Sequence, residues 1–173
     1  MELIAKKNIP NYITVLRIVG TVCLLFLEPL SLEFYIIYTL SGFSDVVDGY
    51  IARKWKLTSE FGAKLDSIAD LLFYAVMVLK ILPLLIKKLP LGVWIAVGVV
   101  LLIRAAAYIV AAFKYKSFAS LHTYMNKMTG AGVFLLPYMI QTVVFVPFCM
   151  VLSVVAASAA GQELFIHIRG NAT

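Results

Sequence analysis

The sequence has few charged residues and few of the residue types that hold soft metals or form disulfides. Only 14% of its 173 residues are Asp, Glu, Lys or Arg, and 62% are hydrophobic, whereas about a quarter of a soluble domain is charged. Its two cysteines, Cys23 and Cys149, stand alone in apolar segments, which excludes a C-x-x-C metal or redox site and gives no reason to expect a disulfide. The composition therefore excludes an ordinary soluble domain and indicates an integral membrane protein.

The net charge of +6 does not indicate a nucleic-acid partner. The basic residues flank the apolar runs, as the positive-inside rule expects of a membrane protein. No basic patch interleaved with aromatic residues is present. We therefore expect membrane lipids, and no nucleic acid, among the partners.

Long apolar runs predict an all-α integral membrane protein with about six transmembrane helices. Runs near twenty residues are long enough to cross a bilayer, and they fall at about 11–27, 34–53, 61–82, 91–113, 128–145 and 147–163. The sequence predicts a proline-bounded loop from Pro83 to Pro90 and a longer polar stretch from Lys114 to Lys127. We expect one domain over residues 1–173, in which residues 1–10 form either an amphipathic segment on the membrane surface or a plain cationic anchor.

The distribution of Lys and Arg predicts the orientation. With six spans, ten of these residues fall on one side, and Lys80, Lys87 and Lys88 fall on the other. The positive-inside rule then places both termini and the loop over residues 53–64 in the cytoplasm. The expected location is the cell (plasma) membrane, with several passes.

Four aspartates lie inside two of these apolar runs, where an ionisable side chain is costly and marks a functional site. Asp45 and Asp48 are about one helical turn apart near the end of one span, and Asp66 and Asp70 are one turn apart at the start of the next. The turn between the spans folds both acidic stripes toward one polar, cytoplasm-facing cavity. Carboxylates this close repel each other unless positive charge lies between them.

Divalent metal ions would supply that charge. Carboxylate oxygens suit Mg²⁺, Mn²⁺ or Ca²⁺, and two ions on shared carboxylates can clamp a phosphoryl group. Arg53 offers a planar fork for phosphate, while Gly49 and Gly62 allow a close approach. The pattern predicts phosphate-ester or diphosphate chemistry at the membrane surface. The alternatives are structural acids neutralised by Lys or Arg, and an intramembrane cation transporter.

The acids belong to a signature over residues 45–70, D-x2-D-G-x2-A-R-x8-G-x3-D-x3-D. It consists of Asp45, Asp48, Gly49, Ala52, Arg53, Gly62, Asp66 and Asp70. The pattern resembles that of the CDP-alcohol phosphotransferase family, membrane enzymes of phospholipid synthesis, and fills every position. The resemblance implies a six-helix membrane domain, usually a homodimer. In that family an acceptor hydroxyl attacks the phosphorus of a CDP-linked lipid and displaces CMP.

The resemblance also implies roles for individual residues. The four aspartates would bind two divalent ions, Mg²⁺ or alternatively Mn²⁺, and Asp70 would also be the base for the acceptor hydroxyl. Gly49, Ala52 and Arg53 would line the CDP-lipid site, and we add Gly62 from the same signature.

The opening run resembles N-I-P-N-x-I/L-T-x-x-R, a start common in bacterial members that make phosphatidylglycerol phosphate, and this favours glycerol 3-phosphate as the acceptor. Within this run Asn11, Thr14 and Arg17 recur at helical spacing. Asn11 and Thr14 either face the same cavity and contribute to CDP-lipid binding, or cap and anchor the first helix. Arg17 lies a turn deeper, where a charge is more costly.

The acceptor stays open between several alcohols. The run from Asp66 to Leu71, D-S-I-A-D-L, differs from the D-P-L-A-D-K of that branch and is closer to the L-D-S-x-A-D of serine-using relatives. The F-G-x-x-P-A that usually follows in those relatives is missing here. Serine, inositol phosphate and phosphatidylglycerol are therefore alternatives, and a CDP-choline or CDP-ethanolamine transferase ranks lower. A phosphorylated acceptor needs cations beyond Arg53, and four residues are candidates: Arg104, Lys114, His122 and Lys127. Interfacial anchoring also explains the lysines, and a polar loop also explains His122.

Overall fold

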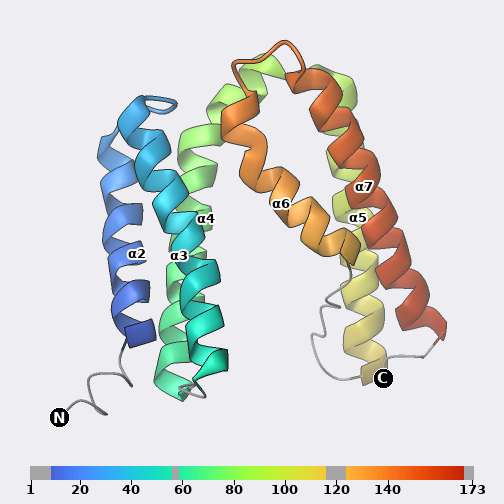
Figure 1. Ribbon diagram of the computed structural model, residues 1–173. Coiled ribbons are helices and arrows are strands. Elements are labelled where there is room, and N and C mark those ends of the chain that lie inside the picture. The colour runs from blue at the N-terminus through green and yellow to red at the C-terminus, as the bar shows by residue number, and fades with distance from the viewer. Residues whose placement is uncertain (1–8, 56–58, 116–123, 170–173) are drawn as a thin grey trace. The chain divides into compact units, whose positions relative to one another are not determined.

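The computed structural model describes residues 9–55, 59–115 and 124–169. Within these residues all of the regular structure is α-helical, which confirms the predicted all-α class. The helices are α2 (Ile9–Phe26), α3 (Leu32–Lys54), α4 (Glu60–Lys88), α5 (Leu91–Tyr115), α6 (Tyr124–Met139) and α7 (Phe145–Arg169) (Figure 1).

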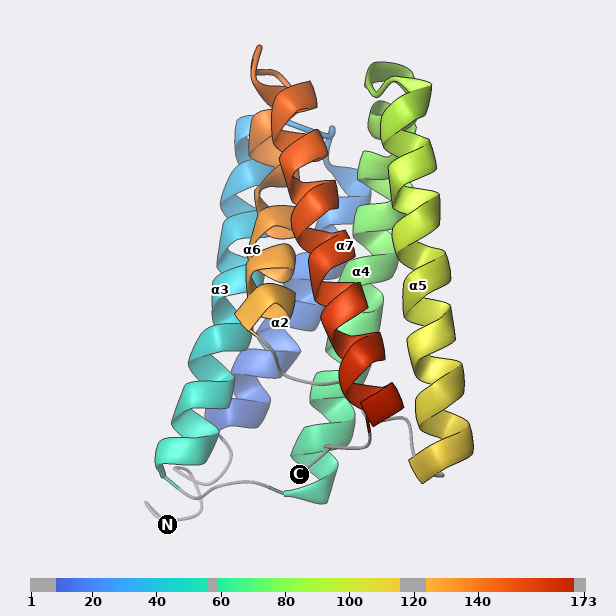
Figure 2. The same cartoon turned by 90° about the vertical axis from the view of Figure 1, so that its right-hand side faces the viewer.

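The chain divides into two compact units, Met1–Leu84 and Leu85–Thr173. In the first unit α2 packs along α3, and α4 runs beside them (Figures 1 and 2). In the second unit α7 packs against both α5 and α6.

Serine caps begin two helices of the first unit. The hydroxyl oxygen of Ser31 accepts a hydrogen bond from the backbone N–H of Phe34 at 3.1 Å, and that of Ser59 accepts one from Gly62 at 3.0 Å. Such caps satisfy N–H groups that have no partner within the helix. The Ser59 cap fixes the start of α4 directly before its acidic stripe.

Small residues and stacked rings hold the first unit together. A Cβ atom on Gly20 of α2 would lie 2.8 Å from the hydroxyl oxygen of Ser41 on α3, so glycine permits this close approach. The ring of Tyr38 stacks on Phe34 at 5.9 Å and on Phe73 of α4 at 5.5 Å between centroids. These contacts set α3 against both neighbours and thereby position the acidic ends of α3 and α4.

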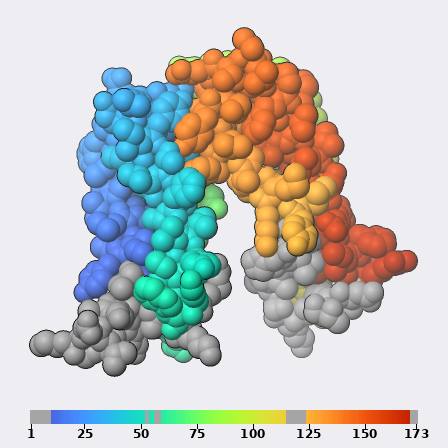
Figure 3. Space-filling model, viewed as in Figure 1, coloured from blue at the N-terminus to red at the C-terminus, as the bar shows by residue number. Residues whose placement is uncertain are grey.

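Three helices of the described chain, α4, α5 and α7, are long and apolar enough to cross a membrane. The apolar stretch of α2 is shorter, from Pro10 to Phe26. Large apolar side chains cover the outer surface of the first unit, including Leu16 on α2 and Leu40 on α3, which are 69% and 65% exposed (Figure 3 shows the surface that these helices form). These features fit a helical membrane protein, and the count of six spans stays a prediction.

The predicted loop beginning at Pro83 is wrong, because α4 continues through Pro83 to Lys88. Proline removes one backbone donor but has a backbone angle compatible with a helix. Here apolar residues follow it directly, and the neighbouring Ile81 is buried. The proline therefore lies within the helix instead of ending it.

The predicted boundaries of the last two spans are also wrong. The predicted span 128–145 corresponds to α6, which ends at Met139, and the predicted span 147–163 corresponds to α7, which reaches Arg169. Glu163 at the predicted end of the span and His167 one turn beyond it are both fully buried, so the chain stays helical past this polar pair.

Candidate functional site

Three of the four signature aspartates converge closely enough to share a metal ion. One carboxylate oxygen from each of Asp45 and Asp48 on α3 and Asp66 on α4 lies within 4.8 Å of the other two. Ligand oxygens lie about 2.0–2.6 Å from Mg²⁺ or Ca²⁺. Oxygens on opposite sides of one ion are then about 4–5 Å apart, so this spacing fits a divalent cation.

A cation from α2 connects all four aspartates. The guanidinium of Arg17 donates hydrogen bonds to Asp45 through Nη1 and to Asp66 through Nη2. Its nitrogens also lie 3.3 Å from an oxygen of Asp70 and 3.9 Å from an oxygen of Asp48. The Arg17 side chain is only 2% exposed. The three helices therefore meet around one buried positive charge.

Thr14 also lies against the acidic cluster. Its hydroxyl oxygen is 2.9 Å from Oδ2 of Asp48 and 3.0 Å from the carbonyl oxygen of Pro10, one turn earlier. The single hydroxyl proton can serve either acceptor. Thr14 thus restrains Asp48, the most buried of the four acids.

Asn11 faces α4 at the glycine of the signature. A Cβ atom added to Gly62 would lie 2.9 Å from Oδ1 of Asn11 and 3.0 Å from the hydroxyl oxygen of Ser59. The missing side chain therefore lets the start of α2 approach the start of α4. Asn11, Thr14 and Arg17 form one polar stripe on α2, and its members lie against the signature residues of α3 and α4.

The four carboxylates differ in exposure. The side chain of Asp48 is 5% exposed, whereas those of Asp45, Asp66 and Asp70 are 48%, 46% and 45% exposed. Burial on one side only leaves carboxylate oxygens that a ligand can reach. Asp45, Asp66 and Asp70 are therefore open to a ligand on one side of the cluster, and Asp48 lies on its buried side.

Three further signature positions, Gly49, Ala52 and Arg53, belong to α3. Gly49 is half-buried on α3, one residue after Asp48. Ala52 and Arg53 belong to the backbone of α3, but their side chains lie outside the described residues. Their expected contact with the CDP-lipid stays a prediction.

The candidates for acceptor binding belong to the second unit and have separate contacts there. Arg104 on α5 donates a hydrogen bond to Oδ1 of Asn126 on α6 at 2.9 Å. Lys114 lies 3.2 Å and 2.9 Å from the carbonyl oxygens of His167 and Ile168 at the end of α7. The Lys127 ammonium lies 5.7 Å from the ring centroid of Tyr124. His122 lies outside the described residues.

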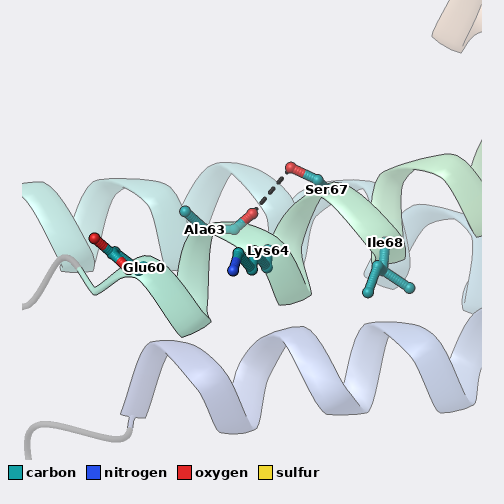
Figure 4. Close-up of a pocket in the computed structure, with 5 residues that line it drawn as sticks. All are labelled: Glu60, Ala63, Lys64, Ser67 and Ile68. Carbon is teal, nitrogen blue, oxygen red and sulfur yellow. Dashed lines mark hydrogen bonds between the residues drawn. The ribbon is translucent and has the colours of Figure 1, made fainter.

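An open hollow on α4 is distinct from the acidic cluster. It is lined by Glu60, Ala63, Lys64, Ser67 and Ile68 (Figure 4). The hydroxyl of Ser67 donates to the carbonyl oxygen of Ala63 at 2.9 Å, as the dashed line shows. At 3.6 residues per turn, these positions lie on another side of α4 from the stripe of signature residues. None of the four aspartates lines the hollow.

Arg17 is the site residue that the sequence pattern did not assign. The sequence showed a charged residue deep in an apolar run, in helical register with Asn11 and Thr14. That signal pointed to a functional role but did not name its partners. The partners lie 28 to 53 positions away along the chain, so only the packing of α2 against α3 and α4 identifies them.

Comparison with known proteins gives one family over most of the chain. The family model described as CDP-alcohol phosphatidyltransferase matches residues 7–166. No solved structure matches the chain.

The chain is also similar to curated proteins with two different acceptors in their names. A CDP-diacylglycerol–glycerol-3-phosphate 3-phosphatidyltransferase of Haemophilus influenzae is 35% identical over 103 residues, which are 57% of this chain and 53% of that protein. The protein of the same name from Rickettsia bellii is 34% identical over 87 residues, 44% of this chain and 45% of that protein.

A CDP-diacylglycerol–serine O-phosphatidyltransferase of Methanocaldococcus jannaschii is 43% identical over 69 residues, which are 40% of this chain and 32% of that protein. The matches to the Haemophilus and Rickettsia proteins span about half the length of those relatives.

Proposed function

The chain belongs to the CDP-alcohol phosphatidyltransferase family, and from this premise we propose that it transfers a phosphatidyl group from CDP-diacylglycerol to glycerol 3-phosphate. The acceptor hydroxyl forms a bond to the phosphorus on the lipid side of the diphosphate. The bond from that phosphorus to the bridging oxygen breaks, and CMP leaves with this oxygen. The names of the Haemophilus and Rickettsia relatives support glycerol 3-phosphate as the acceptor.

The convergence of four carboxylates around Arg17 is the observation that carries this proposal. Oxygens of Asp45, Asp48 and Asp66 have the chemistry and the spacing that suit a divalent ion. Asp45, Asp48, Asp66 and Asp70 would hold two ions, Mg²⁺ or alternatively Mn²⁺. When bound, such ions neutralise negative charge on the diphosphate and on the departing CMP.

Asp70 is the proposed base. Its side chain lies at the partly exposed side of the cluster, where it can receive the proton of the acceptor hydroxyl. Removing this proton as the oxygen–phosphorus bond forms increases the nucleophilicity of the acceptor. The proton stays on the Asp70 carboxyl until solvent takes it.

The residues proposed to bind the CDP-lipid lie next to the carboxylates in the chain or in the fold. They are Asn11, Thr14, Gly49, Ala52, Arg53 and Gly62. Gly62 and Asn11 meet at the start of α4, and Thr14 contacts Asp48. Arg53 follows the acidic stripe of α3 and would donate to phosphate oxygens as a planar fork.

The residues proposed to bind the acceptor are Arg104, Lys114, His122 and Lys127. Arg104 is the leading candidate because it is a half-buried cation within an apolar helix, where charge is costly. Its partner, Asn126, is a neutral amide, so the charge of Arg104 stays available for an anionic acceptor. A phosphate group on that acceptor would pair with it.

Serine is a second candidate acceptor because of two observations. The Methanocaldococcus relative is named for serine, and the run from Asp66 to Leu71 is closer to the serine-using pattern. We also propose that the protein is a homodimer in the plasma membrane, with both termini and the active site in the cytoplasm. The charge distribution and the family resemblance support this arrangement.

Release of CMP by the purified protein in detergent micelles tests the proposed reaction. CDP-diacylglycerol and Mg²⁺ are supplied with glycerol 3-phosphate, serine, inositol phosphate or phosphatidylglycerol in separate reactions. We expect CMP only with glycerol 3-phosphate, no CMP after chelation, and none from Asp66→Asn. CMP release with serine alone would mean that serine, and not glycerol 3-phosphate, is the acceptor. Folded protein that releases no CMP with any acceptor would contradict the proposed reaction.

A further inference from the structure

Arg17 lies among more acidic side chains than its single positive charge can balance. When all four aspartates are ionised they carry four negative charges, and Arg17 is the one cation that the described contacts place among them, so three negative charges are then unbalanced. Arg17 is nevertheless 2% exposed, and burying a guanidinium is favourable only beside compensating acids. The acids and the arginine therefore depend on one another.

The guanidinium contacts the same carboxylates that a metal ion would use. Its two terminal nitrogens bind Oδ1 of Asp45 on α3 and Oδ1 of Asp66 on α4. Both residues, with Asp48, form the group whose oxygens lie within 4.8 Å of one another. A divalent ion that bound these oxygens would lie against a positive guanidinium, which repels it.

Nε, the third nitrogen of the Arg17 guanidinium, is less well satisfied than the two terminal nitrogens. Among the described residues, the buried Nε–H has no hydrogen-bond partner, although a guanidinium presents five donors. A buried donor without an acceptor costs free energy. Arg17 is therefore well paired through Nη1 and Nη2 and lacks a hydrogen-bond partner at Nε among the described residues.

We propose that Arg17 is an internal counter-ion of the metal site, which holds the acidic stripes of α3 and α4 together before metal binds and is displaced from the carboxylates when divalent ions load. The inference rests on the metal binding of the proposed function. Arg17 is then a positioning residue for the metal site. Its removal makes the metal-free protein less stable, because the aspartates repel each other, and makes metal binding tighter, because a competing cation is absent.

Binding of Mn²⁺ tests the counter-ion role of Arg17 without requiring turnover. The electron paramagnetic resonance signal of the free ion measures this binding. We expect Arg17→Gln to bind Mn²⁺ at least roughly tenfold more tightly than the wild type, because a unit charge a few ångströms away is removed. Arg17→Lys, which keeps the charge but loses the fork, should fall between them. Equal or weaker binding by Arg17→Gln would overturn the proposal.

Lys80→Gln is the matched control. Lys80 is a half-buried cation of the same unit, but it donates to the carbonyl oxygen of Leu27 at 2.8 Å and not to the acids. Its replacement should leave the affinity for Mn²⁺ unchanged. An equal gain in Mn²⁺ affinity in both variants would mean that the net charge of the protein, and not the position of Arg17, sets the affinity. That result would contradict the proposal.

Thermal unfolding in detergent gives a second, independent measurement. In chelator, Arg17→Gln should unfold at a lower temperature than the wild type, and saturating Mn²⁺ should remove this difference. A variant that stayed unfolded even when purified in Mn²⁺ would show that Arg17 is needed in the loaded site and would overturn the proposal. These results also separate the two proposals. If the wild type released no CMP but Arg17→Gln still bound Mn²⁺ more tightly than the wild type, the proposed reaction would be contradicted and the role of Arg17 would stand.

Discussion

The two compact units bury ionisable side chains in different ways. In the first unit, side chains from α2, α3 and α4 meet, and three of the four aspartates stay nearly half exposed. In the second unit, Glu163 and His167 lie one turn apart on the same helix, with 4.0 Å between Oε1 and Nε2, and both are fully buried. A cluster that several helices build and leave partly open can bind a ligand. A fully enclosed pair on one helix contributes to packing.

The largest expected difference between the units is in the effect of replacing a carboxyl group by an amide. Asp70→Asn should lower the rate of CMP release by roughly 10²–10⁴-fold, as for loss of a general base, with little change in the unfolding temperature. Glu163→Gln should instead lower the stability of the protein by about 1–3 kcal/mol, since a buried hydrogen-bonding group is altered, and leave the activity of folded protein intact. Turnover and thermal unfolding of both variants check this.

Two results would contradict this distinction between a catalytic carboxylate in the first unit and a structural one in the second. If Asp70→Asn kept full activity, its assignment as the base would be wrong. If Glu163→Gln stayed stable but inactive, the buried pair of α7 would belong to the catalytic machinery.

Arg104 gives a smaller expected effect and tests whether the second unit contributes to substrate binding. Arg104→Ala should raise the KM for glycerol 3-phosphate roughly tenfold, which corresponds to the loss of one charged hydrogen bond, and leave the KM for CDP-diacylglycerol unchanged. Steady-state kinetics with each substrate varied in turn measure this. Asn126→Ala is the matched control, because it removes the described partner of Arg104 but keeps the cation. An unchanged acceptor KM in Arg104→Ala would exclude this role.

The smallest expected effect concerns the glycine of the signature. Gly62→Ala should destabilise the first unit by about 1 kcal/mol, because the new Cβ atom is too close to Asn11 and Ser59 and the end of a side chain must move. Replacing Asn11 by Ala in the same chain should restore part of this stability, as thermal unfolding would show.

Gly161→Ala is the control in the second unit, since its Cβ atom would meet nothing within 4 Å. Alanine favours a helix over glycine by about 1 kcal/mol, so this variant should be as stable as the wild type or more stable. Equal behaviour of the two variants would mean that the approach of α2 to α4 does not depend on Gly62.

The sequence predicted the helical class and the two acidic stripes well because both depend on local periodicity. Asp45 with Asp48, and Asp66 with Asp70, are neighbours on a helix whatever surrounds them. The ends of helices were harder to predict. Pro83 resembles a terminator but lies within α4, and the polar end of α7 is helical because Glu163 and His167 are buried inside the second unit.

The sequence by itself determined the chemical family and the carboxylates that define it, because the signature lies within 26 residues of chain. Only the tertiary structure decided what balances those carboxylates. Arg17 and Thr14 reach residues 28 to 53 positions away, and no periodicity within one helix specifies which face of another helix it will contact. The charge of the site is set by the packing of α2 against α3 and α4, where a buried cation is stable only beside acids.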